Sequence, residues 1–390
     1  MKTPLRRFAS SPLEGGTAPV ARRSRFHGAC WLGALVLAVS PVFAATPKAE
    51  VVANGLQNPW GLAFIGDGRM LVTERPGRMR IVEPDGHIGA PLAGVPKVDA
   101  VGQGGLLDVV ADSQFERNRT IYFCFSEPGA GGNSTALASA RLSDDATKLE
   151  DVKVVFSQKP KFASRVHFGC RIAEAKDHTL FLTLGDRFQR MDDAQTLDNH
   201  HGKVVRLRKD GSAPPDNPFT TKPGALPEIW SYGHRNLQGA AIGPDGRLWT
   251  SEHGPQGGDE INRPEAGKNY GWPVITYGEN YGGGAIGEGL TSKDGLEQPL
   301  HYWVPSIAPS GMVWVSSERY GKDWKGSMLV GSLKFRHLVR LKFNGTKLVK
   351  EEKLLPDLNQ RVRDVRQGPD GLIYLLTDHV RGQLLRLQPQ

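Results

Sequence analysis

Cysteine is scarce in this chain, and the spacings by which cysteines hold zinc or haem are missing. The 390 residues include three cysteines. Neither a Cys-x-x-Cys pair nor a Cys-x-x-Cys-His run occurs, which excludes the usual thiolate metal sites, dithiol redox motifs and covalently attached haem. Cys30 lies in the N-terminal segment, so Cys124 and Cys170 remain. The sequence leaves open whether these two approach within bonding distance.

Long helical repeats and membrane-spanning apolar runs are also lacking. The apolar run from Ala29 to Val39 is too short to span a bilayer comfortably. It follows Arg22 and Arg23 and precedes Val42-Phe43-Ala44, an order typical of a secretory signal and its cleavage site. We therefore expect residues 1–44 to be a signal peptide and the mature protein to be periplasmic or secreted, without a stable membrane anchor. The choice between Sec and twin-arginine export stays open.

Strong basic charge is absent from the remaining chain. The formal net charge is +8, but residues 1–44 carry six Lys or Arg and one Glu, a net +5. This leaves +3 for residues 45–390. Nucleic-acid binding thereby loses its compositional support, and no nucleic-acid partner is expected.

Turn-forming residues are abundant, with 47 glycines and 27 prolines, and a strand pattern recurs between them. A turn feeds a continuous apolar run that ends in an acidic or polar residue, which suits a strand buried on both faces. The recurrence predicts an all-β fold, a six-bladed β-propeller in a single domain over residues 45–390, with five or seven blades as alternatives. The pattern occupies residues 66–74, 177–186, 243–252 and 368–378.

Closure of the propeller and its long loops are predicted as well. Strand-like runs at residues 50–53 and 383–387 are expected to pair in one blade, which removes an exposed sheet edge. Residues 187–227 and 262–300 are rich in Pro, Gly and Asn and are predicted to be inserted loops. Such loops on one face of a propeller are suited to building a pocket.

Polar side chains stand just before or after several apolar strands, and the set is rich in cations. A multiply anionic ligand held by charge-assisted hydrogen bonds suits such a set. Gly254-Pro255 is a tight turn whose carbonyls can face a cation. Each residue alone has a structural alternative, since a lone His is often a buried hydrogen-bonded residue and surface Lys or Arg are usually solvated. The set is Gln103, His167, Asp186, Arg235, Asn236, Lys334, Arg361 and Arg363.

Eight short motifs, in order along the chain, resemble those of the soluble quinoprotein sugar dehydrogenases, the glucose/sorbosone dehydrogenase family. The resemblance covers almost all of residues 45–390 and is nearest to the periplasmic aldose sugar dehydrogenases. The motifs are Gln103-Gly104-Gly105-Leu106, His167-Phe168-Gly169 with Arg171, Leu184-Gly185-Asp186, Tyr232-Gly233-His234-Arg235-Asn236, Gly254-Pro255 with Asp259-Glu260-Ile261-Asn262, Ala308-Pro309-Ser310, Gly331-Ser332-Leu333-Lys334 and Arg361-Val362-Arg363-Asp364.

This resemblance implies a propeller that binds pyrroloquinoline quinone (PQQ) and calcium and oxidises aldoses at C1 to lactones by hydride transfer to PQQ. His167 would be the general base, Asp186 would orient it, and Arg235 would stabilise negative charge on the quinone. The absence of a haem motif leaves the electrons to an external acceptor. The remaining implied ligands are Gln103, Asn236, Lys334, Arg361 and Arg363 for PQQ, and Gly254, Pro255, Glu260 and Tyr270 for calcium.

Two other functions compete with the dehydrogenase. A calcium-dependent propeller lactonase would hold a metal in the channel with several acidic or amide side chains. A non-catalytic carbohydrate-binding propeller would need no base. The cationic set disfavours the first alternative, and the presence of His167, Asp186 and Arg235 together disfavours the second. Neither the preferred aldose nor the electron acceptor follows from the sequence.

Overall fold

β-Strands dominate residues 47–390, the range that the structure, a computed structural model, describes. The predicted signal peptide lies outside these residues and stays a prediction. Within this range helical structure is limited to α1 (Phe115–Asn118) and the 3-10 helices η1 (Met191–Gln195) and η2 (Pro356–Leu358). No helix here is long and apolar enough to cross a membrane. The described residues belong to one unit, Ala44–Gln390.

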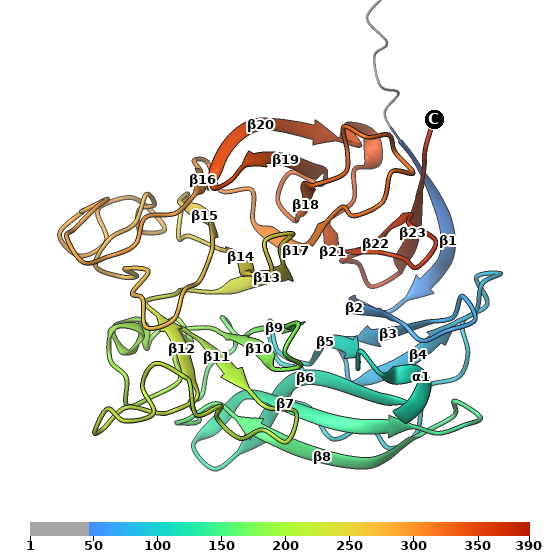
Figure 1. The fold of residues 1–390 in the computed structure, drawn as a ribbon, viewed down its shortest axis with the longest axis horizontal. Helices are drawn as coiled ribbons and strands as arrows, with labels where there is room; N and C mark the ends of the chain where they lie inside the picture. Colours follow the sequence, from blue (N-terminus) through green and yellow to red (C-terminus); the bar gives the residue numbers. More distant parts are fainter. Residues whose placement is uncertain (1–46) are drawn as a thin grey trace, which may run out of the picture. The chain divides into compact units, whose positions relative to one another are not determined.

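Six antiparallel sheets form the six blades, as predicted (Figure 1). In Figure 1 the first strand of each blade faces the centre and the later strands lie further out. Each innermost strand contacts the innermost strands of both neighbouring blades, so the ring is closed. The innermost strands are β2 (Pro59–Phe64), β5 (Leu106–Ala111), β9 (Gly169–Glu174), β13 (Leu237–Ile242), β17 (Pro309–Trp314) and β21 (Val362–Gln367).

The second strands of the blades include all four segments that the recurrent pattern identified. β3, β10, β14 and β22 are buried along their whole lengths, because each lies between two strands of its own blade and between two neighbouring blades. Continuous apolar sequence is therefore what these positions require. The second strands are β3 (Met70–Glu74), β6 (Thr120–Gly129), β10 (Leu180–Leu184), β14 (Leu248–Glu252), β18 (Ser327–Ser332) and β22 (Ile373–Thr377).

The outer strands complete the blades. The blade that begins with β2 has three strands and the other five have four. The third strands are β4 (Arg78–Val82), β7 (Gly132–Leu142), β11 (Lys203–Leu207), β15 (Asp259–Asn262), β19 (Leu338–Asn344) and β23 (Gly382–Gln388). The fourth strands are β8 (Leu149–Ser157), β12 (Ile229–Tyr232), β16 (His301–Trp303), β20 (Lys347–Leu354) and β1 (Lys48–Leu56).

The N-terminal strand closes the last blade. β1 pairs antiparallel with β23, with Glu50 opposite Arg386 and Val51 opposite Leu385. The predicted pairing of the two chain ends is therefore confirmed. The prediction for residues 187–227 was wrong in part, because β11 lies within them and pairs with β10. Its five residues include Lys203 and Arg206, so β11 lacks the continuous apolar run by which other strands were recognised. Residues 263–300, in contrast, form a connection between β15 and β16 without a named strand.

Hydrophobic side chains pack between the blades rather than in one central core. Each of the six interfaces between adjacent blades has its own cluster of buried apolar residues. For example, Leu107 of β5 and Leu137 of β7 pack with Leu182 of β10. The centre of the ring is therefore left to polar side chains from the innermost strands.

Candidate active site

One end of the propeller collects the polar residues that the sequence identified. Successive strands of a blade are antiparallel, so the start of its innermost strand and the end of its second strand lie at the same end. A cavity of about 260 Å³ lies at this end. All six blades contribute to its wall, which includes Trp60, Arg75, Gln103, Phe168, Gly169, Asn236, Gln238, His253, Leu333, Arg361, Arg363 and Asp378.

His167 and Asp186 form a buried hydrogen-bonded pair beside this cavity. His167 precedes β9, Asp186 follows β10, and the imidazole Nδ1 lies 2.7 Å from Asp186 Oδ1. Because an ionised carboxylate only accepts hydrogen bonds, Nδ1 of the neutral ring carries the proton and Nε2 remains as the basic nitrogen. Phe168 and Gly169, the next residues along the chain, line the cavity. The pair therefore lies immediately behind the cavity wall.

Three further hydrogen bonds fix Asp186. Its Oδ1 accepts from the backbone N–H of Phe188 at 2.8 Å, and its Oδ2 accepts from Trp272 Nε1 at 2.8 Å. Its own backbone N–H donates to the carbonyl of Arg235 at 2.8 Å. A carboxylate held by this many donors is oriented before any ligand arrives, and it orients the imidazole in turn.

Burial and charge set the protonation of the pair. Burial lowers the pKa of His167 because the imidazolium is poorly solvated there; Asp186 opposes this effect, whereas Arg235 adds to it. Burial alone would raise the pKa of Asp186, but the neighbouring imidazole, Arg235 and the Phe188 hydrogen bond hold that pKa below its ordinary value. At neutral pH the arrangement is thus a neutral imidazole beside a carboxylate, which suits a general base.

Gln103 links the cavity wall to the backbone of the histidine. Its Oε1 accepts from the N–H of His167 at 2.8 Å, and its own N–H donates to the carbonyl of Arg165 at 2.7 Å. His167 has a φ of 54°, in the left-handed region that non-glycine residues seldom occupy. Such a conformation persists only where the surroundings hold it, and Gln103 supplies one of these contacts.

Arg235 and Asn236 precede β13, and the two residues face different environments. Arg235 Nη1 donates to the carbonyls of Gly254 at 2.7 Å and His253 at 3.2 Å, and its guanidinium lies 5.2 Å from the centre of the Trp272 ring. Asn236 lines the cavity, and its Oδ1 accepts from the N–H of Gly169 at 3.2 Å. Arg235 is therefore next to the histidine pair and the predicted calcium turn, although it is not among the residues that line the cavity.

Arg361 and Arg363 enter the cavity from the blade that begins with β21. Both guanidinium groups donate to Asp378 Oδ2, at 3.1 Å and 2.8 Å, and Arg363 Nη1 also donates to Gln238 Oε1 at 3.2 Å. Burial alone would raise the pKa of Asp378, but the two arginines depress it far below its ordinary value. Lys334 is exposed and lies outside the cavity wall, whereas its neighbour Leu333 belongs to the wall. The structure thus brings together all the predicted cofactor ligands except Lys334 and Arg235.

Arg75 is a third cation of the cavity, and the sequence analysis did not identify it. It follows β3, lines the cavity, and donates from Nη1 to the carbonyl of Gly102. The glycine-rich loop before β5 fits around it: a Cβ on Gly105, which has a φ of 135°, would lie 2.7 Å from Arg75 Cγ. The sequence did contain a pattern that could have identified Arg75, because this residue directly follows the acid that ends the first recurrent segment. Asp378 likewise ends the fourth segment.

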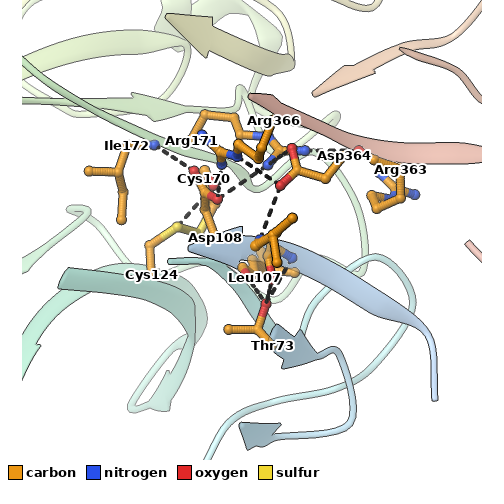
Figure 2. Close-up of polar contacts among 12 residues, drawn as sticks. Thr73, Leu107, Asp108, Cys124, Cys170, Arg171, Ile172, Arg363, Asp364 and Arg366 are labelled. Carbon is orange, nitrogen blue, oxygen red and sulfur yellow. Dashed lines mark hydrogen bonds and ion pairs between the residues drawn. A yellow bond between two sulfur atoms is a disulfide. The ribbon is translucent and has the colours of Figure 1, made fainter. Parts of the chain in front are cut away.

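Below the cavity, four charged side chains, three of them buried and Arg366 half-buried, form a cluster that we call the floor cluster (Figure 2). Arg171 Nη1 lies 3.2 Å from Asp108 Oδ1 and 2.8 Å from Asp364 Oδ1. Arg366 reaches the same two carboxylates, with Nη2 2.6 Å from Asp108 and Nε 2.9 Å from Asp364. Each aspartate also accepts a backbone N–H, at Ile172 and Leu62 respectively, both at innermost strands.

The floor cluster holds the backbone of two residues of the cavity wall. Arg171 donates from Nε to the carbonyl of Gln238 at 2.7 Å and from Nη2 to the carbonyl of Arg363 at 3.0 Å. Its guanidinium lies 4.0 Å from the ring centre of Trp60, a third residue of the wall. The cluster therefore positions the cavity while its own charges are balanced.

A disulfide settles the question that the sequence left open. Cys124 on β6 and Cys170 on β9 are bonded, with their Cα atoms 5.9 Å apart (Figure 2). The bond joins two adjacent blades. It ends at the residue between Gly169, which lines the cavity, and Arg171 of the floor cluster.

Three of the four predicted calcium ligands lie around a small second cavity of about 10 Å³, near the size of one water molecule. Gly254, Glu260 and Tyr270 line it, whereas Pro255 is outside its lining. Burial raises the pKa of Glu260 well above its ordinary value, and the carboxylate of Glu252 adds to this effect. A bound cation would relieve both causes.

Oxygen donors of several kinds surround this small cavity. Asn262 Nδ2 donates to both Glu252 Oε1 and Glu260 Oε2, at 3.0 Å and 2.9 Å, while its buried Oδ1 has no hydrogen-bond partner among the described residues. The hydroxyl of Tyr270 is already used, since it donates to the carbonyl of Arg263 at 2.7 Å. Within residues 47–390 no group of three His, Cys, Asp or Glu side chains gathers at one point. Carboxylate, amide and main-chain oxygens are nevertheless the ligands that Ca²⁺ prefers.

Comparison with known proteins gives consistent matches over nearly the whole described chain. The sequence model of the family Glucose / Sorbosone dehydrogenase matches residues 56–386. Aldose sugar dehydrogenase YliI of Escherichia coli (strain K12) is 46% identical over 350 residues, which cover 89% of this chain and 94% of that protein.

Solved structures agree with these matches. The apo-form of the soluble aldose sugar dehydrogenase from Escherichia coli superposes with a TM-score of 0.85 at 45% identity, over 88% of this chain and 100% of that one. The PQQ-bound form of aldose sugar dehydrogenase from Streptomyces coelicolor gives a TM-score of 0.71 at 28% identity, over 88% and 99% of the two chains.

Proposed function

The chain belongs to the glucose/sorbosone dehydrogenase family, and from this membership we propose that it is a quinoprotein oxidoreductase that converts aldoses at C1 into lactones. The observation that carries the proposal is the buried His167–Asp186 pair directly behind a cavity with three guanidinium groups in its wall. A base and an anion-binding cavity at one place are what this reaction needs.

PQQ is the cofactor that suits the cavity by charge. It carries three carboxylates, and Arg75, Arg361 and Arg363 offer positive charge in the wall, against the single carboxylate of Asp378. The side-chain amides of Gln103 and Asn236 lie in the same wall and can pair with the carbonyls of the cofactor. Lys334, exposed beside Leu333, is proposed to bind at the rim of the cavity.

Calcium is proposed at the turn of Gly254 and Pro255, with a second ion at Glu260 and Tyr270. The buried, mutually repelling carboxylates of Glu252 and Glu260 and the unpartnered oxygen of Asn262 support an ion near Glu260. The hydroxyl of Tyr270 is already hydrogen-bonded, so we propose that this residue binds calcium through its main-chain oxygen.

Bound in this cavity, PQQ would supply the hydride-accepting chemistry of a quinone, and a calcium ion would supply Lewis-acid polarisation. His167 Nε2 accepts the proton of the anomeric hydroxyl, which makes the hydride leave more readily. Asp186 keeps the ring in the required tautomer and stabilises the imidazolium that forms. Arg235, next to this pair, supplies positive charge where negative charge develops on the oxidant.

The partners and the compartment follow from the same proposal. The substrate is a small aldose, and the electrons pass to an external acceptor. The Cys124–Cys170 disulfide supports export to an oxidising compartment, the periplasm or the outside of the cell. This support is independent of the signal peptide predicted for residues 1–44.

The aspartates of the channel do not favour the lactonase alternative. It requires acidic or amide side chains free to hold a metal there. Asp108 and Asp364, the two aspartates of the floor cluster, are each paired with both Arg171 and Arg366. Their charges are therefore already neutralised by arginine.

Reconstitution tests the proposal directly. The purified apo-protein is given PQQ and Ca²⁺, and reduction of a cationic dye is followed with a panel of aldoses. We expect aldose-dependent reduction that requires both additions, with the matching lactone as product. Absence of any rate in a sample whose circular dichroism and unfolding transition are those of a folded protein would refute the dehydrogenase function.

A further inference from the structure

A second concave site adjoins the cofactor cavity, between the blade that begins with β17 and the blade that begins with β21. Its volume is about 450 Å³, within the range of about 300–1,000 Å³ that is common for small-molecule sites. We call it the arginine groove. The groups that dominate its wall are Arg336, Arg361, Arg381, Asn359, Gln360 and Gln383.

The arginine groove has an excess of positive charge. Its single acid is Asp378, whose Oδ2 already accepts from Arg361 and from Arg363. Among residues 47–390, neither Arg336 nor Arg381 forms an ion pair, so two guanidinium groups face the groove without a carboxylate partner. Guanidinium and amide groups together supply many hydrogen-bond donors, which suits a ligand with several negative charges.

Two residues of the groove hold unusual backbone conformations. Arg336 has a φ of 58° and Asn359 a φ of 49°, both in the left-handed region. Arg336 Nη1 donates to Asn359 Oδ1 at 2.9 Å, which ties the two loops together across the groove. Left-handed residues that are not glycine tend to cluster at ligand clamps, where the surroundings compensate for the strain.

The groove and the cofactor cavity share a wall, because Arg361 and Asp378 line both. His167, in contrast, precedes β9, and β9 and β21 are separated by three steps around the ring of six blades. A sugar at His167 and an anion in the groove therefore lie on opposite sides of the cavity. The two ligands would not compete for the same space.

We propose that the arginine groove binds a small, multiply charged anion that acts as the electron acceptor of the enzyme. This inference rests on the proposed function. Oxidation of the C1 alcohol to the lactone releases two electrons and two protons. Two one-electron anionic acceptors of the hexacyanoferrate(III) type each take one electron and become hexacyanoferrate(II), and the two protons pass to solvent.

Binding is tested first, without turnover. Hexacyanocobaltate(III) has the charge and shape of hexacyanoferrate(III) but is redox-inert, and it is titrated calorimetrically into apo-protein at low ionic strength. The variants are Arg336→Gln, Arg381→Gln and the double substitution, none of which alters the cofactor cavity. Arg247→Gln is the matched control, because Arg247 lies in the turn between β13 and β14, at the opposite end of the propeller.

We expect the double variant to bind the anion about tenfold more weakly than wild type, since each exposed charge pair contributes a modest amount. Arg247→Gln should bind as wild type does. Equal affinity in wild type and the double variant would overturn the proposed site.

Kinetics with the reconstituted enzyme then tests the redox role. In the double variant we expect the KM for hexacyanoferrate(III) to rise about tenfold while the kinetics with a cationic phenazinium acceptor stay unchanged. If the phenazinium is reduced and the KM for hexacyanoferrate(III) does not change, the acceptor role is wrong although the dehydrogenase function stands. If neither acceptor is reduced with any aldose, the dehydrogenase function itself fails, and the acceptor role with it.

Discussion

The charged residues of the floor cluster and of the proposed cofactor cavity are of the same types, arginine and aspartate, but the two regions differ in charge balance. The floor has two arginines and two aspartates that pair with one another, and all of them are buried except Arg366, which is half-buried. The cavity has three arginines and the single aspartate Asp378. Adjacent positions on one strand serve both regions, since Arg363 enters the cavity and Asp364 belongs to the floor. The protein thus balances its charges in the floor, where a rigid support is needed, and keeps an excess of positive charge at the proposed cofactor site.

Because of this contrast, replacing an arginine in the floor cluster and replacing one in the cavity should have different consequences. Removing one partner from a buried, balanced cluster leaves uncompensated charge and destabilises the fold. Removing a cation from the cavity reduces the repulsion among the remaining arginines. It weakens the binding of a negatively charged ligand rather than the fold. A substitution in the floor cluster should therefore lower the stability of the fold, whereas a substitution in the cavity should lower the affinity for the cofactor.

The largest effect is expected at the base beside the cavity. His167→Gln removes the group proposed to accept the hydroxyl proton, so kcat should fall by about 10²- to 10⁴-fold. PQQ affinity should change little, because His167 is not in the cavity wall. His178→Gln is the control, since this histidine is exposed in the turn between β9 and β10. Full activity of His167→Gln would show that the base is misassigned.

The next largest effect is expected in the floor. Arg171→Met leaves Asp108 and Asp364 with Arg366 alone, and we expect it to lower the free energy of unfolding of the apo-protein by about 3–5 kcal/mol. Chemical denaturation measures this change. Arg141→Met, which removes a half-exposed arginine paired with Asp144 and Glu150, should have little effect. Equal stability of both variants would mean that the floor cluster does not support the fold.

A smaller effect is expected from the cation that the sequence analysis did not identify. Arg75→Met should weaken PQQ binding about tenfold, because it removes roughly one charge-assisted hydrogen bond to the cofactor. Its unfolding transition should stay close to that of wild type. Arg319→Met is the matched control, because Arg319 also donates to a backbone carbonyl but lies outside the cavity. Unchanged PQQ affinity would remove Arg75 from the ligand set.

The pH profile should show the smallest change. Activity requires neutral His167, so kcat/KM should fall as the pH drops through the pKa of this residue, which burial lowers below the ordinary value of about 6.5. Asp186 favours the charged imidazolium, and Asp186→Asn should therefore move the acid limb to lower pH, along with a loss of rate. A limb that moves to higher pH would contradict the assigned charge state of the pair.

The sequence predicted the fold well because propeller strands have a distinctive pattern. β3, β10, β14 and β22 are buried on all sides, so their apolar runs and preceding turns were visible without a structure. β6 follows α1 and β18 follows a Trp-Lys-Gly turn, so the pattern does not identify them. β11 is short and lies within a loop-rich stretch, and its pairing with β10 and β12 in the folded protein reveals it.

The site was predictable where it depends on one hairpin and not where it depends on several blades. His167 and Asp186 flank β9 and β10, so antiparallel pairing alone brings them together. Arg75 and Asp378 are charged residues after strands, which look like solvated loop residues until the ring closes around the cavity. The floor cluster gave a different signal, because Asp108 and Arg171 are charged residues inside largely apolar strands, and Asp364 alternates with valines and arginines in β21. Their pairing depends on which strands face the centre.

The central claim is that the excess positive charge of the cavity, rather than the balanced charge of the floor, binds the tricarboxylate cofactor. The equilibrium titration of apo-protein with PQQ in the presence of Ca²⁺ tests it most directly, with Arg363→Met compared with wild type. We predict that Arg363→Met binds PQQ about 10- to 100-fold more weakly, the loss of a hydrogen bond to a charged group. An unchanged dissociation constant in a folded Arg363→Met variant would contradict the claim.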